Sequence, residues 1–227
     1  IGERDEVITT PFSFIATANC ILFERAKPVF VDIEEETLNI NPELIEQAIT
    51  ERTKGILPVD VFGHPCAWDE IMDVAQKNEL YVIEDSCEAL GAEYKGKRCG
   101  SFGIAAAFGF YPNKQITTGE GGMIVTDDEV LANLCRSMRN QGRGEDMSWL
   151  NHERLGYNFR LNEMSAALGL SQLEKIEQIL EKRSEVANQY MFRLQEVDEV
   201  TVQFIRKDVV MSWFVFVIRL KEGIDRD

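Results

Sequence analysis

Histidine is scarce in this chain of 227 residues, which contains only His64 and His152. Two isolated histidines offer little to a histidine-rich metal site or to a hydrolase triad. The five cysteines are an odd number without a CxxC pair, which argues against a disulfide framework or a zinc site. We expect these cysteines to be small core residues: Cys20, Cys66, Cys87, Cys99 and Cys135.

Basic residues are also few. The chain has 24 lysines and arginines but 39 aspartates and glutamates, and its formal net charge is -15. Such a balance disfavours nucleic-acid binding, which requires basic patches for the phosphates. A nucleotide attached to a small substrate is compatible with it, since a diphosphate needs only a few local cations. Arg139, Arg143 and Arg160 are candidates, although a surface ion pair is the simpler interpretation of any one of them.

Long apolar runs are absent as well. No stretch reaches the ~20 residues that cross a bilayer, and no cationic segment precedes an apolar one. Hydrophobic residues nevertheless form 44% of the chain, enough for a sizeable core. We therefore expect a cytoplasmic enzyme that is neither membrane-bound nor exported.

Apolar strand-like runs alternate with helical patterns, which predicts an α/β fold with a mostly parallel sheet flanked by helices. The runs are Lys27 to Ile33, Lys54 to Phe62, Leu80 to Glu84, Ile104 to Tyr111 and Gly122 to Val125. Helices are predicted to begin at Asn41-Pro42, Trp68 and Asp127-Asp128. Residues 141–154 are predicted to form a long loop, and Val209 to Leu220 a further strand.

A longer helical pattern runs from Leu161 to about Gln195. The apolar spacing within it predicts one helix with a single buried face. The residues of that face are Leu170, Leu173, Ile176, Ile179 and Leu180.

Lys114 is the leading candidate for chemistry, because it follows one of the apolar runs and precedes the cluster Gly119-Glu120-Gly121-Gly122. Glycines let the backbone approach a ligand closely. A suitably placed lysine amine attacks aldehydes and forms a Schiff base with a carbonyl cofactor or substrate. A solvated loop lysine is the alternative.

Asp85 directly follows the run Leu80 to Glu84 and lies twenty-nine positions before Lys114. Ligands of open α/β sheets bind beyond the carboxyl ends of the strands, which is where this carboxylate is predicted to lie. Pyridoxal 5'-phosphate (PLP) needs a lysine for its Schiff base and a carboxylate for its pyridinium nitrogen. Lys114 and Asp85 supply that pair, unless Asp85 is only an N-cap or a loop ion-pair partner.

These residues resemble the DegT/StrS family of PLP-dependent aminotransferases, which act on keto sugars attached to nucleotides. The resemblance runs nearly end to end and in the family's order. Asp5 to Asn19 and Ala26 to Asp32 look like the opening strands of the large domain. Further similar blocks are Pro58 to Gly63, Glu84 to Ala92, the Lys114 loop and Leu155 to Arg160.

The resemblance implies a fold-type-I large domain over residues 1–195 and the beginning of a small C-terminal α+β domain over residues 196–227. It also implies that the chain is an interior segment of a longer aminotransferase. The segments expected outside it include the family's N-terminal helix and the loop whose amides bind the cofactor phosphate.

By the same resemblance, Lys114 binds the cofactor covalently and moves the proton between substrate carbon and cofactor, while Asp85 pairs with the pyridinium nitrogen. Phe14 lies where the family places an aromatic ring over the cofactor; a strand-core phenylalanine is the alternative. Asn158 lies where an amide reaches the cofactor phosphate from the neighbouring subunit, which implies a homodimer with shared active sites. A turn asparagine is the alternative there.

Two positions depart from the family. Gly109 stands five positions before Lys114, where many members carry a hydroxyl residue that binds the phosphate. Glu88 stands where many relatives have Gln or His near the phenolic oxygen of the cofactor ring. A carboxylate facing that anion is expected to be protonated or turned away, so the role of Glu88 stays open.

The implied function is transfer of an amino group, from glutamate, to a keto group of a nucleotide-linked hexose in polysaccharide biosynthesis. Related sugar dehydratases of this family replace the Schiff-base lysine with histidine, so Lys114 argues against dehydration. A catalytically silent regulatory or sensor protein of the same fold is the alternative from another class.

Overall fold

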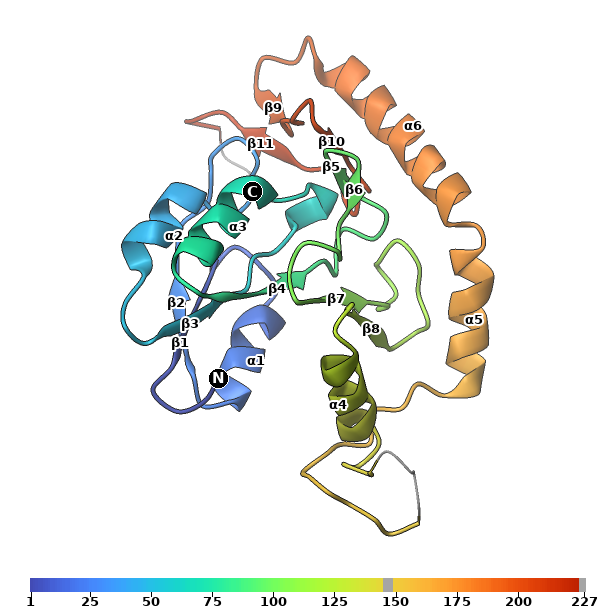
Figure 1. Cartoon of the computed structure of the whole chain (residues 1–227). Coiled ribbons are helices and arrows are strands. Elements are labelled where there is room, and N and C mark those ends of the chain that lie inside the picture. Colours follow the sequence, from blue (N-terminus) through green and yellow to red (C-terminus); the bar gives the residue numbers. More distant parts are fainter. Residues whose placement is uncertain (145–148, 225–227) are drawn as a thin grey trace.

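The computed structural model describes residues 1–144 and 149–224. At its centre lies a six-stranded sheet in the order β2-β1-β3-β4-β7-β8, and only β7 and β8 pair antiparallel (Figure 1). The predicted α/β fold with a mostly parallel sheet is confirmed. The strands are β1 (Glu6–Thr9), β2 (Lys27–Phe30), β3 (Thr53–Ile56), β4 (Tyr81–Asp85), β7 (Ala105–Gly109) and β8 (Gly122–Val125).

Helices connect the parallel strands, because parallel neighbours need a crossover. α1 (Ala16–Phe23) links β1 to β2, α2 (Pro42–Ala48) precedes β3, α3 (Trp68–Lys77) precedes β4, and α4 (Glu129–Arg139) follows β8. The Asn41 and Asp128 side chains cap α2 and α4. The three predicted helix starts are therefore confirmed, whereas a strand reaching Asn19 is wrong because Ala16–Phe23 forms this crossover.

The main core lies between the sheet and helices α2 and α3. Ile8 and Ile56 from the sheet meet Ile45 from α2 and Ile71 from α3, and all four are buried. Trp68 is also fully buried, with its ring stacked on Phe102 at 4.9 Å between centroids. Burial of each such side chain contributes about 1.5–3 kcal/mol, which holds the helices to this face of the sheet.

Three predicted strands end earlier than expected. The strand predicted over Lys54 to Phe62 ends at Ile56, and a 3-10 turn, η1 (Val61–Gly63), follows. Within that turn Phe62 has φ +60° and Gly63 has φ +88°, values that cannot continue a strand. β2 ends at Phe30 and β7 at Gly109.

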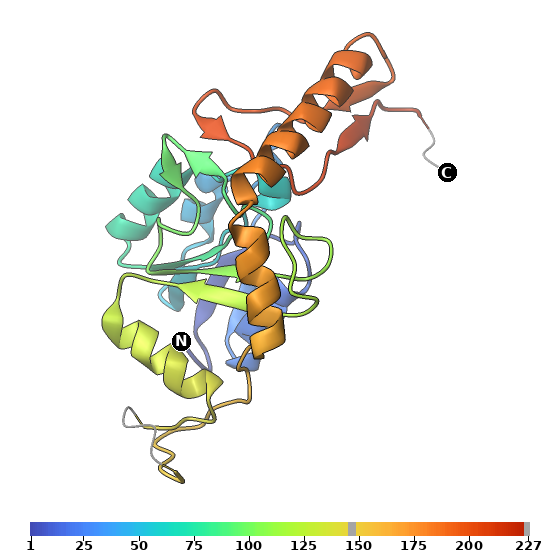
Figure 2. The same ribbon diagram turned by 90° about the vertical axis from the view of Figure 1, so that its right-hand side faces the viewer.

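The single helix predicted from Leu161 to about Gln195 is wrong. Two helices, α5 (Glu163–Leu173) and α6 (Ile176–Leu194), run in succession along one side of the sheet (Figure 2). In α5 the Gln172 side chain bonds to the backbone N–H and C=O of Thr117, in the loop after Lys114. In α6 the Arg183 side chain donates hydrogen bonds to the backbone carbonyls of Trp213 and Phe214. The break lets each helix meet a different surface.

The buried face predicted for this segment is also wrong. Leu170 and Leu173 are exposed, and Ile176, Ile179 and Leu180 are only half-buried. Spacing indicates which side chains share a face, but another element must lie against that face to bury it.

The C-terminal segment forms short strands rather than the one strand predicted over Val209 to Leu220, and that prediction is wrong. β10 (Val209–Val210) pairs with β5 (Glu93–Tyr94), which also pairs with β6 (Lys97–Arg98). β11 (Ile218–Leu220) pairs with β9 (Val200–Val202). Between them Trp213, at φ +50°, interrupts the extended backbone.

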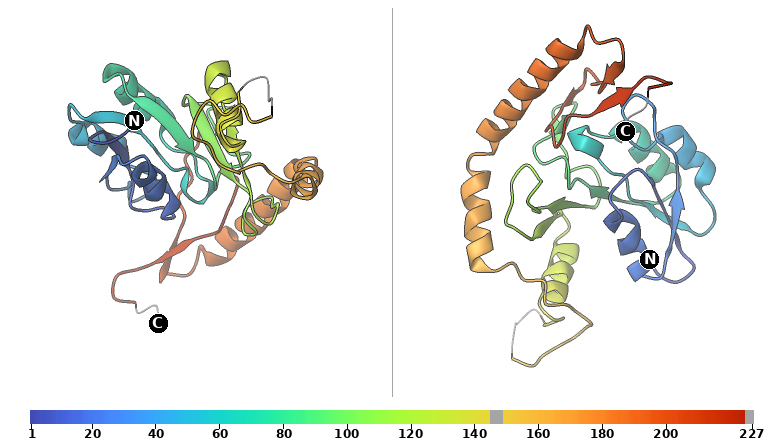
Figure 3. Two further views of the ribbon diagram at one scale, coloured as in Figure 1. Left: turned by 90° about the horizontal axis from the view of Figure 1, so that it is seen from below. Right: turned by 180° about the vertical axis from the view of Figure 1, so that it is seen from behind.

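Seen from below and from behind, the C-terminal strands lie at the end of α6, beside the sheet (Figure 3). A small cluster of Ala187, Met211 and Trp213 is buried there, separate from the main core. A domain division at residue 195 stays a prediction. The predicted loop over residues 141–154 lies partly outside the described residues. Across residues 1–144 and 149–224, no helix combines the length and apolar character that a membrane crossing requires.

Candidate active site

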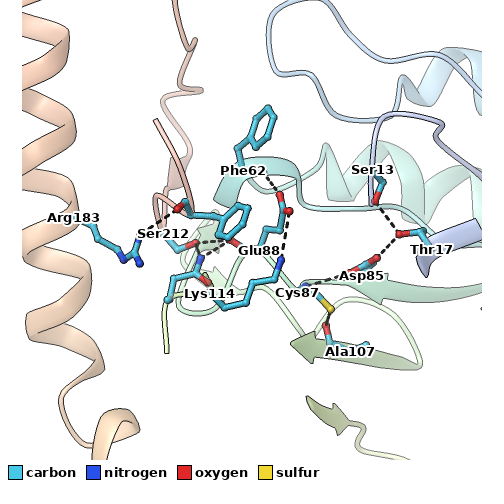
Figure 4. Close-up of polar contacts among 12 residues, drawn as sticks. Ser13, Thr17, Phe62, Asp85, Cys87, Glu88, Ala107, Lys114, Arg183 and Ser212 are labelled. Atoms are coloured by element: carbon cyan, nitrogen blue, oxygen red, sulfur yellow. Dashed lines mark hydrogen bonds and ion pairs between the residues drawn. The ribbon is translucent and has the colours of Figure 1, made fainter. Parts of the chain in front are cut away.

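The candidate site lies at the carboxyl ends of two neighbouring parallel strands (Figure 4). Asp85 is the last residue of β4 and pairs in register with Ala107 of β7. Lys114 lies in the loop that follows β7, and Glu88 lies in the turns that follow β4. The sheet therefore brings these side chains to the edge where open α/β folds bind ligands.

Asp85 is held by donors on both of its oxygens. The Thr17 hydroxyl donates to Oδ2 at 2.7 Å, and the Cys87 backbone N–H donates to Oδ1 at 3.3 Å. The Ser13 and Thr17 hydroxyl oxygens are 2.8 Å apart. Because Thr17 gives its proton to Asp85, Ser13 donates to Thr17. These bonds orient an acceptor-only carboxylate, and Asp85 caps no helix.

The Lys114 amine is enclosed rather than solvated, since only 15% of the side chain is exposed. Its Nζ lies 3.5 Å from Oε1 of Glu88 and 4.2 Å from the ring centroid of Phe214. The interpretation of Lys114 as a solvated loop lysine is therefore wrong. The amine has an anion and an aromatic face as its neighbours.

Cys87 lies among these groups. Burial raises the pKa of the Cys87 thiol, the Asp85 carboxylate raises it further and the Lys114 amine opposes the rise. Gly109 lies beside it, because a Cβ placed there would be 3.5 Å from Cβ of Cys87 and 3.7 Å from Cε of Lys114. These are ordinary van der Waals contacts, so a side chain at position 109 would lie directly against Cys87 and Lys114.

A buried acid supports the chain behind Asp85. Asp60 is fully buried and accepts hydrogen bonds from the Ser86 hydroxyl and from the Cys66 backbone N–H, both at 2.9 Å. Burial raises the pKa of Asp60 to about 7, and the nearby Glu84 carboxylate adds to the rise. Through Ser86 this side chain anchors the residue next to Asp85.

The structure does not bring all predicted site residues together. Phe14 is 75% exposed and lies just before α1, the helix that supplies Thr17, so the strand-core alternative is wrong. Asn158 is exposed and forms a bridge with Asn140, next to the C-terminal end of α4. It makes no contact with Lys114 or Asp85 in this chain.

Several residues at the site were missed by sequence reasoning. Phe214 lies one hundred positions after Lys114, and no local pattern connects them. The Gln115 amide donates to the Glu88 carbonyl at 2.5 Å and to the Ser212 hydroxyl at 2.9 Å. The Phe62 backbone N–H donates to Glu88 at 2.8 Å. Only the block Pro58 to Gly63, with its turn glycine, could have pointed to one of them.

These residues fit the two protein groups that PLP requires. An enclosed amine and an oriented carboxylate lie at the same sheet edge, with an exposed aromatic residue just before α1. Lys114 would hold the cofactor covalently and Asp85 would hold its ring nitrogen.

Comparisons with known proteins identify the family and relatives of the chain. Residues 1–227 match the model of the DegT/DnrJ/EryC1/StrS aminotransferase family. The spore coat polysaccharide biosynthesis protein SpsC of Bacillus subtilis is 40% identical over 98% of this chain and 59% of its own length. GDP-perosamine synthase of Escherichia coli O157:H7 is 38% identical over 100% of this chain and 62% of its own length.

Solved structures of related enzymes have the same fold over nearly the whole chain. DesV of S. venezuelae, in complex with a ketimine intermediate, matches 98% of this chain and 60% of its own at a TM-score of 0.93 and 36% identity. The structure of GDP-4-keto-6-deoxymannose-3-dehydratase (ColD) matches 100% of this chain and 63% of the ColD chain, with a TM-score of 0.93 and 30% sequence identity.

One further relative carries a different kind of name. The pleiotropic regulatory protein of Geobacillus stearothermophilus is 43% identical over 86% of this chain and 52% of its own length. The chain thus spans between 52% and 62% of the length of these three curated relatives. The family's aminotransferases are PLP-dependent and have the fold-type-I architecture. The match over all 227 residues and the agreement of the fold show that this chain belongs to the DegT/DnrJ/EryC1/StrS aminotransferase family.

Proposed function

We propose that this chain carries the catalytic core of a PLP-dependent aminotransferase that transfers an amino group, from glutamate, to a keto group of a nucleotide-linked hexose. The observation that carries the proposal is the pairing of an enclosed Lys114 with an oriented Asp85 at the adjoining ends of β4 and β7. If positions 85 and 114 had only a structural role, many residue types would be tolerated there. A PLP site requires a carboxylate at one position and a lysine at the other.

The protein groups have separate tasks in this proposal. PLP, when bound, supplies an electron sink for the carbon that gains or loses a proton. Lys114 binds the cofactor, and its amine, once free, moves the proton at the substrate carbon. Asp85 keeps a proton on the ring nitrogen, and Thr17 together with the Cys87 N–H keeps Asp85 in place.

The substrate class is supported by relatives and by a basic hollow. One relative is named for GDP-perosamine synthesis and another for spore coat polysaccharide biosynthesis. A hollow of about 360 Å³ at the C-terminal end of α4 is lined by Arg136, Arg139, Arg143 and Arg160. Within the described residues none of these arginines forms an ion pair. Such guanidinium groups suit a diphosphate.

A cytoplasmic homodimer completes the proposal. Asn158 and Arg160 lie in the segment between α4 and α5, and neither side chain contacts Lys114 within this chain. In a dimer with shared active sites, this segment of one subunit would place the Asn158 amide beside the cofactor phosphate bound by the other subunit. Phe14, which is exposed beside the Asp85 site, would cover the ring.

The decisive experiment incubates the full-length protein with glutamate and a panel of nucleotide-linked keto hexoses. Mass spectrometry should detect the amino sugar and 2-oxoglutarate in equal amounts. Absence of any amino sugar with a protein that holds PLP would contradict the proposal.

A regulatory protein is the second candidate, because one relative is named a pleiotropic regulatory protein. The two candidates differ in one optical measurement. The visible absorbance of the bound cofactor should shift when glutamate is added to an aminotransferase, whereas a protein that has lost the chemistry should show no shift. A dehydratase is disfavoured by Lys114, since the dehydratases carry histidine at that position by resemblance.

A further inference from the structure

The Glu88 carboxylate lies between a backbone N–H and the amine of Lys114 (Figure 4). Phe62 N–H donates to Oε2 at 2.8 Å, while Nζ of Lys114 lies 3.5 Å from Oε1. The two oxygens therefore have different partners. The main-chain bond sets the rotation of the carboxylate so that its second oxygen faces the amine.

The donor of that bond is in a strained conformation. Phe62 has φ +60° and ψ +11°, and the left-handed region costs a non-glycine residue about 1–2 kcal/mol. The Phe214 N–H donates to the Phe62 carbonyl at 3.1 Å, and the Phe62 ring packs edge-on against Phe12. Strain of this kind persists where neighbours hold it and is frequent at functional sites. Here it directs an N–H at Glu88.

The Glu88 carbonyl is bound by the side chain of Gln115, the residue that follows Lys114. Gln115, which directly follows Lys114, is 4% exposed and donates to the Glu88 carbonyl at 2.5 Å. Ser212 donates to the same carbonyl at 3.2 Å. The separation between Nζ and Oε1 is therefore set by hydrogen bonds from the Gln115 and Ser212 side chains to the Glu88 main chain, as well as by two flexible side chains.

The pair is shielded from water. The Lys114 and Glu88 side chains are 15% and 18% exposed, and the Phe214 ring lies 4.2 Å from Nζ. Exclusion of water strengthens the interaction of the two charges. Within the described residues, Lys114 is the only cation that forms an ion pair with Glu88.

We propose that Glu88 is a positioning residue that holds the amine of Lys114 as the ammonium, through their ion pair, whenever that amine is not bonded to the cofactor. An opposite charge beside an amine stabilises its protonated form. Glu88 thus keeps on Lys114 the proton that this amine delivers to the substrate carbon in the proposed function.

The use of this ion pair in catalysis rests on the proposed function, but the ion pair itself is a property of the cofactor-free protein. The test therefore follows the free amine. Cofactor-free protein is reductively methylated with formaldehyde and a borane reductant over a series of pH values, and peptide mass spectrometry gives the labelling rate of Lys114. Exposed Lys54 serves as the internal standard.

Glu88→Gln keeps the shape and the acceptor for Phe62 but removes the charge that holds the ammonium. We expect Lys114 to be labelled about tenfold faster in this variant at a fixed pH, and its pH profile to move to lower pH. Glu88→Asp keeps the charge on a side chain one methylene shorter and should give an intermediate rate. Glu120→Gln, an exposed change in the same loop, should match the wild type.

Equal labelling rates of Lys114 in the wild type and in Glu88→Gln at every pH would overturn the inference. If Glu88→Gln does not fold, a wild-type profile in Glu88→Asp overturns it instead. Failure of the proposed function looks different: the labelling difference would be present, but no keto sugar would be aminated. Amination with unchanged labelling would remove only the role of Glu88.

Discussion

Helices α2 and α3 bury several of their apolar side chains, whereas α5 and α6 bury almost none. Ile45 of α2 and Ile71 of α3 are 0% exposed, but α5 has no buried residue and α6 has only Ala187. The difference lies in what faces each helix. The sheet lies against α2 and α3, while α5 meets the loop at Thr117 and α6 packs on the small cluster around Trp213.

The same two regions divide the site. The sheet region supplies Asp85, Glu88 and Lys114, and the C-terminal region supplies Phe214 and the links that hold it. We therefore expect substitutions in the sheet region to abolish chemistry or stability, and those in the C-terminal region to have smaller effects. The following predictions test that division, from the largest expected effect to the smallest.

Lys114→Ala should lower turnover by at least ~10⁴-fold and remove the visible absorbance of the covalently bound cofactor, because no other amine is enclosed at this place. Lys114→Arg should fail as well, since a guanidinium stays protonated. Steady-state kinetics and absorbance spectra measure both effects. Near wild-type turnover in the alanine variant would remove Lys114 from the mechanism.

Asp85→Asn should lower turnover by about 10²–10³-fold while PLP still binds, because an amide cannot hold the ring nitrogen as a cation. Glu88→Gln should cost only about tenfold. Comparing kcat and cofactor affinity of the two variants separates binding from catalysis. A Glu88→Gln variant as inactive as Asp85→Asn would mean that Glu88 is the more essential carboxylate.

Ile45→Ala should lower the free energy of unfolding by about 2–5 kcal/mol, because it opens a cavity under α2. Leu170→Ala, on α5, should change it by less than ~0.5 kcal/mol, since that side chain is 62% exposed. Urea unfolding of both variants measures the contrast directly. Equal losses would show that α5 is packed as tightly as α2.

Gly63→Ala should lower the free energy of unfolding by about 2–3 kcal/mol. At φ +88° an added Cβ would lie 2.6 Å from the Ser212 hydroxyl and 2.9 Å from the Trp213 backbone nitrogen, where the C-terminal segment meets the site. Gly119→Ala is the matched control, because its φ is +81° and nothing lies within 4 Å of the new Cβ. It should cost only ~1 kcal/mol. Thermal unfolding of the two variants separates the cost of the steric clash at position 63 from the cost of a positive φ at an alanine.

Phe214→Leu should lower turnover about fivefold, which corresponds to loss of about 1 kcal/mol of cation–π contact with Lys114. A leucine keeps an apolar neighbour over the amine but has no π face. Steady-state kinetics at saturating substrates give the comparison. A loss as large as that in Asp85→Asn would contradict the division between the two regions.

Much of the sheet region could be predicted because its signals are local. Asn41-Pro42 marks the start of α2, Asp128 that of α4, and the run Leu80 to Glu84 marks β4. The errors fall where distant contacts decide. Nothing local to Leu161–Gln195 shows that Gln172 must meet Thr117 while Arg183 meets Trp213, and so the break between α5 and α6 was missed.

The sequence by itself determined the α/β class, the helix starts and the candidate pair Asp85 and Lys114, because apolar periodicity, caps and strand ends are properties of neighbouring residues. Only the tertiary structure decided that Phe214 covers Lys114 and that the N–H of Phe62 aims Glu88 at the amine. It also decided which apolar faces are buried. These relations join residues far apart in the chain, and burial depends on the element that packs against a face rather than on the face itself.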